Sequence, residues 1–298
     1  MSHRIQAGLA ATAALACVAG AFYWLGGRNA QAPPTLASAA ATATAPIETP
    51  SVRDAGSASS PASRLPAEVR KVQPAADPGP PLRDGEVLEY SADVSNLSNV
   101  ANLKLQVAEK RDFLGKSAWH LQAFAHTENP LRIVFALDDQ FDSYSDAADM
   151  TSLQYEMHLD ERGQKVTSIQ RMTVTGKELA PANATETRVL PGTRDPLGMM
   201  QYLRNVDWTK TVEVRSPVYD GHKLYDVRAK FASRGEAVTV PAGSYKTSKI
   251  EIRVFENRAE IRDSYFTLYV ADNAARTPVL LEAVLPFATA RVELLRAR

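Results

Sequence analysis

Alternation of apolar and polar residues dominates the chain after about residue 84. In Tyr225–Phe231 every odd position is apolar or aromatic and every even position is charged. Lys249–Val254 and Leu103–Val107 repeat this period of two. The period is typical of β-strands that expose one face of a sheet to water and bury the other. The pattern therefore predicts a mainly β domain.

Turn sequences separate these runs. Asp220-Gly221 fits a two-residue hairpin turn between two apolar runs. Pro241-Ala242-Gly243 and Arg162-Gly163 separate two further pairs of runs. Counting the runs predicts about ten or eleven strands, at spacings that suit an antiparallel meander.

One helix is clearly marked within the β-rich region. Asp195 is a suitable N-cap and Pro196 fits the first helical position. The helix should continue through LGMMQYLRNV, where apolar residues surround most of the circumference, so we expect it to be buried. A second short helix is expected after Pro130 in LRIVFAL, although alternate residues of that segment also fit a strand.

The segment Ser264–Val270 differs from the other predicted strands because neither of its faces is charged. Phe266, Leu268 and Val270 face one way, and Tyr265 and Tyr269 face the other. A strand of this kind should be covered on both faces. The sequence thus predicts a strongly curved antiparallel meander, a half-barrel or open barrel, with one or two short helices packed on it.

The N-terminus has the features of an export signal. His3 and Arg4 precede an uncharged run, Ile5–Leu25, which is long enough to cross a bilayer as a helix. We interpret residues 1–28 as an uncleaved signal anchor that crosses the inner membrane through residues 5–25 and places the rest in the periplasm. A cleaved signal peptide ending near Ala21, which would leave a soluble periplasmic protein, and a lipoprotein modified at Cys17 are the alternatives.

Residues 29–83 are rich in Ala, Pro, Ser and Thr and show no apolar periodicity. Such a segment cannot bury enough surface to offset its ordering entropy, so we expect a disordered linker with a span of roughly 40 Å. Residues 84–298 then form one β-rich domain.

Charge and cysteine content exclude several classes of function. Lys plus Arg and Asp plus Glu are both 34, so no excess positive charge favours nucleic acid as a partner. The single cysteine, Cys17, lies in the N-terminal run, so the domain has no disulfide and no cysteine zinc site. We expect no cofactor and no metal.

The titratable residues form no recognisable catalytic constellation. His120 and His126 are six residues apart, so on one strand they share a face about 20 Å apart, too far to bind one metal ion. The acidic group at Asp138, Asp139, Asp142, Asp146 and Asp149 lacks the glycine spacing of a calcium loop and fits a solvated, turn-rich edge. We therefore predict no enzyme activity.

Four residues are candidates for ligand binding: Met200, Arg204, Tyr265 and Tyr269. Arg204 ends the predicted buried helix, where it either pairs with a carboxylate or meets a ligand anion. Met200 either packs in the core or lines an adaptable lipid pocket. Tyr265 and Tyr269 lie on the doubly apolar strand.

Several short segments, taken in order, resemble the bacterial domain-of-unknown-function family 3108. The segments are Asp84–Tyr90, Phe141–Tyr144, Asp195–Leu197 with Tyr202–Arg204, Val240–Tyr245 and Arg276–Val279. The resemblance covers about Asp84 to Leu295. It implies an exported, β-rich envelope protein with no established biochemical activity, and it gives no catalytic residues to transfer.

Three functions fit these expectations. The first is a non-enzymatic binding module for a lipid-like or extended ligand. The second is a structural or assembly partner that pairs through its sheet edges with another envelope protein. The third is a hydrolase whose site is assembled across strands, which requires partners for histidines such as His120 and His158.

Overall fold

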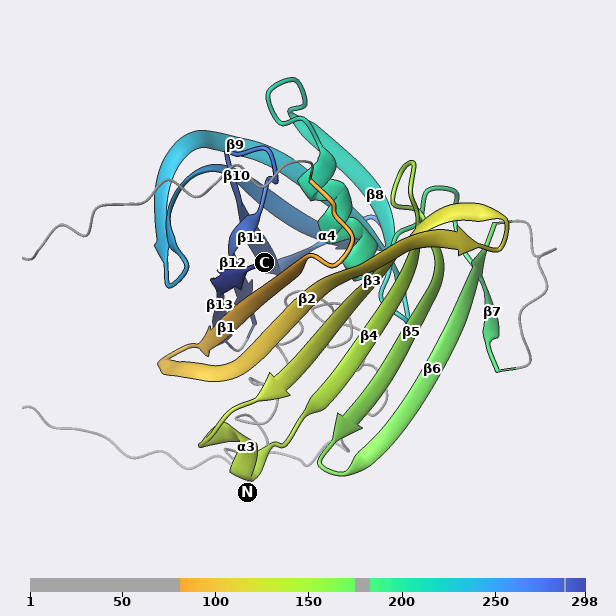
Figure 1. The fold of residues 1–298 in the computed structure, drawn as a ribbon, viewed down its shortest axis with the longest axis horizontal. Coiled ribbons are helices and arrows are strands. Elements are labelled where there is room, and N and C mark those ends of the chain that lie inside the picture. The colour runs from red at the N-terminus through yellow and green to blue at the C-terminus, as the bar shows by residue number, and fades with distance from the viewer. Residues whose placement is uncertain (1–80, 175–182, 287) are drawn as a thin grey trace, which may run out of the picture.

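A computed structural model describes residues 81–174, 183–286 and 288–298, which form one thirteen-stranded sheet and two helices (Figure 1). The predicted anchor, residues 1–28, and the predicted linker up to residue 80 lie outside the described residues. Neither helix in the described ranges has the length and hydropathy needed to cross a bilayer.

The strands fall into two groups along the chain, separated by the longer helix. The first group is β1 (Val87–Val94), β2 (Leu97–Phe113), β3 (Lys116–Thr127), β4 (Asp138–Asp146), β5 (Ser152–Glu161), β6 (Gln164–Thr173) and β7 (Thr185–Arg188). The second is β8 (Glu213–Tyr219), β9 (Leu224–Val240), β10 (Gly243–Glu256), β11 (Ala259–Ala271), β12 (Pro278–Leu285) and β13 (Ala288–Ala297). Helix α3 (Leu131–Val134) lies between β3 and β4, and α4 (Pro196–Asn205) lies between β7 and β8.

The sheet consists of two meanders joined in the middle. Its order is β7-β6-β5-β4-β3-β2-β1-β13-β12-β11-β10-β9-β8, so β1 and β13, from opposite ends of the domain, are central neighbours. Every pair is antiparallel except β6 with the short β7. The predicted antiparallel meander is therefore confirmed. The strand count is higher than predicted partly because β7 has only four residues and no apolar alternation.

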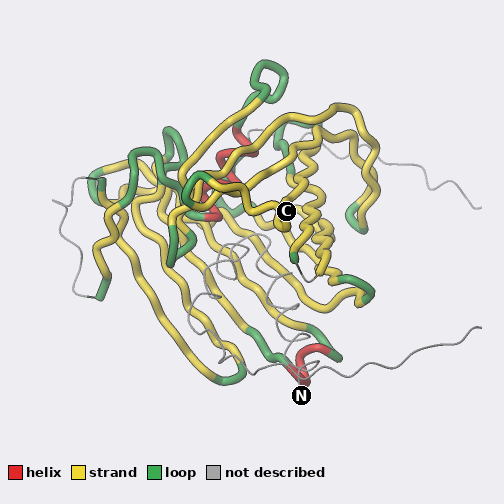
Figure 2. The backbone as a smooth tube through the Cα atoms, turned by 180° about the vertical axis from the view of Figure 1, so that it is seen from behind, coloured by secondary structure: helices red, strands yellow, loops and turns green. Residues whose placement is uncertain are grey.

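Alternate residues of the strands build one core inside the curve of the sheet. On β3 the buried residues Leu121, Ala123 and Ala125 alternate with more exposed ones. Helix α4 lies inside the curve against β3, β4 and β8, and Figure 2 shows the same arrangement from behind. The predicted start of α4 after Asp195 and its burial are both confirmed. The segment after Pro130 forms the one-turn helix α3.

The turns agree with the sequence in position but not always in length. Pro241-Ala242 and Arg162-Gly163 are two-residue connections between paired strands. The β8–β9 connection has four residues, Asp220–Lys223, rather than the two expected. The longer loop forms because Oδ1 of Asp220 accepts hydrogen bonds from the backbone N–H groups of His222 and Lys223, both at 2.7 Å.

The segment just before α4 connects the edge strand β8 to the other half of the sheet. The backbone N–H of Arg194 donates to Pro217 O at 3.0 Å, and that of Tyr219 donates to Arg194 O at 2.8 Å. On the other side, the N–H of Ser152 donates to Thr193 O at 3.0 Å. These bonds hold the start of α4 between β5 and β8.

Candidate functional site

The N-terminal end of α4 is held by a buried carboxylate. Asp195 is fully buried and its Oδ1 accepts from the backbone N–H of Gly198 at 2.8 Å. Its Oδ2 accepts from the hydroxyls of Ser143, at 2.5 Å, and Ser152. Burial raises the pKa of Asp195, and these hydrogen bonds act in the opposite direction. The side chain thus caps the helix and ties it to β4 and β5.

The C-terminal end of α4 is held by a buried ion pair. The Arg204 side chain is 0% exposed, and its two Nη atoms donate to the two Oε atoms of Glu86 at 2.6 Å each. Its Nε donates to Ala275 O at 2.8 Å. A two-pronged pair of this kind fixes orientation as well as distance. Of the two roles considered for Arg204, the structure shows the carboxylate partner.

The loop between β11 and β12 packs across the same end of the helix. Nη1 of Arg276 donates to the main-chain oxygens of Asn205, at 2.7 Å, and Val206, at 3.3 Å. These carbonyls are among those that a helix leaves without partners at its C-terminus. The loop is closed by a bond from the Ala271 N–H to Thr277 O at 2.8 Å. Residues 272–277 therefore form a fixed wall.

Two cavities flank this loop, and Asn273 lines both of them. The smaller cavity has a volume of about 170 Å³. The larger, which we call the basic cavity, has a volume of about 390 Å³. The basic cavity is lined by Arg83, Glu86, Ala242, Tyr245, Asn273, Thr277, Leu295, Arg296, Ala297 and Arg298.

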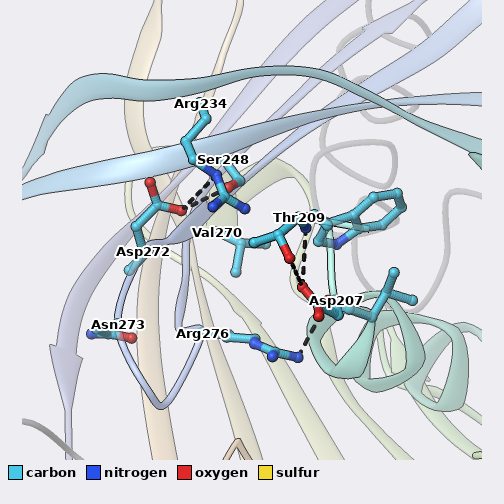
Figure 3. Close-up of a pocket in the computed structure, with 11 residues that line it drawn as sticks. Asp207, Thr209, Arg234, Ser248, Val270, Asp272, Asn273 and Arg276 are labelled. Carbon is cyan, nitrogen blue, oxygen red and sulfur yellow. Dashed lines mark hydrogen bonds and ion pairs between the residues drawn. The ribbon is translucent and has the colours of Figure 1, made fainter. Parts of the chain in front are cut away.

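Polar side chains in the smaller cavity bind one another (Figure 3). Asp272 accepts from the Ser248 hydroxyl at 2.6 Å and lies 4.0 Å from Nε of Arg234. Asp207 accepts from the Thr209 hydroxyl at 2.6 Å. Apart from Asn273, which lines both cavities, these groups already have partners, so the smaller cavity offers few hydrogen bonds to a ligand.

The basic cavity has a different balance of charge. Glu86 is bound to Arg204, so it does not offset the three arginines of the lining. Arg296 lies 3.8 Å from Glu89, and Arg298 pairs with the same carboxylate. Arg83 has no side-chain hydrogen bond or ion pair with any described residue, which leaves the cavity positive.

Neutral polar groups complete the basic cavity. Oδ1 of Asn273 is buried and has no hydrogen-bond partner within the described ranges. Buried acceptors without a partner are uncommon in folded proteins. Burial raises the pKa of Tyr245, so its hydroxyl stays protonated. The cavity therefore presents cationic donors, a hydroxyl and an amide.

The structure does not gather the four predicted ligand-binding residues. Met200 is 8% exposed and packs in the core one turn before Arg204. Tyr265 and Tyr269 lie on the face of β11 opposite Phe266; Tyr265 is half-buried, whereas Tyr269 is 8% exposed and belongs to the packed core. Neither described cavity is lined by Met200, Arg204, Tyr265 or Tyr269.

The face of β11 that carries the two tyrosines is flanked by charge, because strand pairing places Lys249 opposite Tyr269 and Arg253 opposite Tyr265. The Arg253 guanidinium lies 4.6 Å from the Tyr265 ring centre, and Lys249 Nζ lies 5.8 Å from that of Tyr269. Long side chains of β10 thus provide the covering that the uncharged strand led us to expect.

The two histidines of β3 bind different carboxylates. His120 Nε2 lies 2.7 Å from Asp142 Oδ1, and the ring stacks on Tyr144 with centres 4.5 Å apart. His126 pairs with Asp138.

The predicted acidic group is likewise divided: Asp139 faces inward, and burial raises its pKa to about 7. The described residues contain no group of three His, Cys, Asp or Glu side chains that could hold a metal ion.

Sequence reasoning missed the residues that line the basic cavity. Arg83, Asn273, Arg296 and Arg298 lie in segments of ordinary composition that are far apart in the chain. One signal was available: four of the segments behind the family resemblance meet here. Glu86 belongs to the first of them, Arg204 to the third, Tyr245 to the fourth and Thr277 to the last.

The fold and the site define a β-sheet protein with a basic cavity at the end of a buried helix. Residues 89–295 match the family described as protein of unknown function (DUF3108), and the chain belongs to this family. The resemblance noted in the sequence is thereby confirmed. No curated protein matches the sequence.

Three similar solved structures are each covered almost completely. A beta-barrel-like protein of the domain of unknown function DUF1849 from Brucella abortus has 10% identity over 72% of this chain and 97% of its own, with a TM-score of 0.46. A "putative lipoprotein" from Parabacteroides distasonis has 14% identity over 74% of this chain and 97% of its own, with a TM-score of 0.35. A "putative exported protein" with a YmcC-like fold from Bacteroides fragilis has 12% identity over 74% of this chain and 98% of its own, with a TM-score of 0.31.

Proposed function

We propose that this domain is a non-enzymatic binding module of the cell envelope that holds the polar end of a lipid-like or extended ligand in the basic cavity. The observation that supports this most directly is the cavity itself. Its volume of about 390 Å³ lies in the range of small-molecule sites. Its wall combines three arginines with the apolar side chains of Ala242, Leu295 and Ala297.

The volume suits a head group rather than a whole lipid. Leu295 is 39% exposed, so it provides an apolar surface from the cavity to the solvent. A ligand with an apolar tail would leave its tail along this surface and place its polar end among the arginines. Met200 belongs to the packed core and lies outside this cavity.

The proposed location rests on the N-terminal sequence. The uncharged run Ile5–Leu25 would hold the chain in the inner membrane, and residues 29–83 would act as a tether. The domain would then meet ligands that leave or enter that membrane. A soluble periplasmic form, produced by signal cleavage, would carry the same cavity.

Assembly through the sheet edges has less support from the geometry. Edge strand β8 contains Pro217, which has no N–H to donate, and Arg194 already bonds to Pro217 and Tyr219. The opposite edge, β7, has only four residues. Short edges, proline and occupied backbone groups are the means by which proteins prevent strand addition.

Hydrolysis also has less support. His158 has the nearest arrangement to a catalytic group, with Thr167 at 3.4 Å and Glu156 at 3.3 Å. His158 and Thr167 face each other on the regular strands β5 and β6. In regular strands the sheet occupies backbone N–H groups of the kind that an oxyanion hole requires. We therefore favour binding over catalysis.

Photo-crosslinking in cells tests the proposed function on the full chain. A benzophenone amino acid replaces Leu295 at the cavity, and the control carries it at Leu114, which is 54% exposed and outside both cavities. We expect a low-mass amphiphilic adduct at position 295 only. One reproducible protein adduct there would favour the assembly role instead. Equal labelling at both positions, or none, would reject a ligand in this cavity.

A further inference from the structure

The three arginines of the basic cavity come from one rim of the sheet. Arg83 lies just before β1, and Arg296 and Arg298 lie at the end of β13, which pairs with the start of β1. The backbone fixes this rim: the Val87 N–H donates to Arg298 O at 3.1 Å, and the Arg298 N–H donates to Val87 O at 2.9 Å. These bonds fix the backbone of the rim, and the arginine side chains on it are exposed, those of Arg296 and Arg298 by 62% and 58%.

The carboxylates near this rim leave positive charge uncompensated. Arg296 and Arg298 share a single side-chain partner, Glu89, which is not part of the cavity wall. Arg83 has no ion-pair partner among the residues that the structure describes. A guanidinium group matches the geometry of phosphate oxygens and binds them in a two-pronged manner.

We infer that the basic cavity binds a phosphate-bearing group through Arg83, Arg296 and Arg298. The unpaired Oδ1 of Asn273 then accepts a hydrogen bond from a hydroxyl or amine next to the phosphate, and the Tyr245 hydroxyl lies on the same wall. This inference rests on the proposed function and specifies the polar end of its ligand. The phosphate belongs either to a lipid head group or to a soluble phosphate compound.

Titration calorimetry on the full chain in a neutral detergent separates these sources. The probes are inorganic phosphate, dihexanoyl phosphatidylglycerol and the phosphate-free dihexanoylglycerol. We expect the phospholipid to bind at least about tenfold more tightly than inorganic phosphate, and the neutral lipid not to bind measurably. Binding of inorganic phosphate alone would keep the phosphate site but contradict a lipid-like ligand. Equal binding of both lipids would support the proposed function but overturn the phosphate site. If none of the three probes bound, both the proposed function and the phosphate site would be overturned.

A cavity variant and a matched control variant test whether Arg83 and Arg296 bind the phosphate group. We expect Arg83→Gln with Arg296→Gln to weaken phospholipid binding at least tenfold, and the matching lysine variant to restore part of it. The control removes the same charge elsewhere, with Arg111→Gln and Arg215→Gln; each of these arginines pairs with a nearby glutamate and lies outside both cavities. Unchanged affinity in the cavity variant, or an equal loss in the control, would overturn the assignment.

Discussion

The two ends of α4 are both held by buried charged groups, but the two described cavities both lie beside the C-terminal end. At the N-terminal end Asp195 accepts three hydrogen bonds from β4, β5 and the helix itself. A Cβ atom at Gly198 would lie 2.9 Å from Ser145 Oγ and 3.0 Å from Met150 O, so this end is closely packed. At the C-terminal end Arg204 is bound to Glu86 and Ala275, and the two cavities lie beside it.

This comparison distinguishes the residues that hold α4 in the sheet from the residues that line a binding cavity. Buried ionic groups fix α4 in the sheet at both ends, so their presence does not identify a ligand site. What distinguishes the C-terminal end is the set of groups around Arg204, where arginines and an amide remain without sufficient partners. We therefore expect mutations of the clamping residues to reduce stability, and mutations of the cavity wall to reduce binding.

The largest effect should come from breaking the ion pair. Glu86→Gln leaves the guanidinium of Arg204 buried without a counter-charge, and Arg204→Met leaves the carboxylate of Glu86 in the same position. We expect each change to lower the free energy of unfolding by about 3–5 kcal/mol. Urea denaturation followed by tryptophan fluorescence measures this directly.

The double variant Glu86→Gln with Arg204→Met provides the control. Because it removes both charges, it should cost clearly less than the sum of the two single changes. Additive losses would mean that the two residues act independently. Single losses below about 1 kcal/mol would show that the C-terminal end of α4 is held by other contacts, such as those of Arg276.

The packed end should respond to a single added methyl group. We expect Gly198→Ala to lower the free energy of unfolding by about 1–3 kcal/mol, because the new Cβ meets a backbone oxygen that cannot move away easily. The same measurement on Asn205→Ala, at the open end, should show a change within about 0.5 kcal/mol, since the bond of Asn205 uses its main-chain oxygen. Equal costs at both ends would contradict the difference in packing.

The buried carboxyl groups near Tyr155 should cause much of the pH dependence of the free energy of unfolding. Tyr155 is fully buried near three carboxyl groups, and burial raises the pKa of Asp139 to about 7 and that of Asp220 to about 6. Since these values lie above those of the unfolded chain, near 4, the folded state binds more protons and stability should fall as pH rises from about 4 to 7. Asp139→Asn should reduce this fall, by at most about 4 kcal/mol. Denaturation midpoints across that pH range test it, and an unchanged slope would contradict it.

The local signals in the sequence were sufficient for most of the fold. Asp195 and Pro196 mark the start of α4, and the period of two in Tyr225–Phe231 marks β9, because caps and alternation depend on residues close in the chain. The meander followed from turns such as Arg162-Gly163. The pairing of β1 with β13 did not follow, since it joins the two ends of the domain.

The site could not be predicted in the same way. Arg204 was among the four candidate residues, but its partner Glu86 is 118 positions away, and only the folded sheet brings them together. Tyr265 and Tyr269 were chosen because their strand lacks charge, whereas the charged residues that flank them belong to β10. The wall of the basic cavity is likewise assembled from the segment before β1, the β9–β10 turn, β10, the β11–β12 loop and the end of β13, so no single segment carries its signature.

The smallest effect on stability should come from the cavity wall. Asn273→Ala removes an amide whose buried Oδ1 has no partner among the described residues, and it keeps the main-chain oxygen that accepts from the Arg276 N–H at 3.1 Å. We expect the free energy of unfolding to change by less than about 0.5 kcal/mol, because removing an unsatisfied group costs no hydrogen bond. The same variant should weaken binding of dihexanoyl phosphatidylglycerol in calorimetry. A loss of more than about 1 kcal/mol of stability, with unchanged affinity, would place Asn273 among the clamping residues and remove the distinction between the two ends of α4.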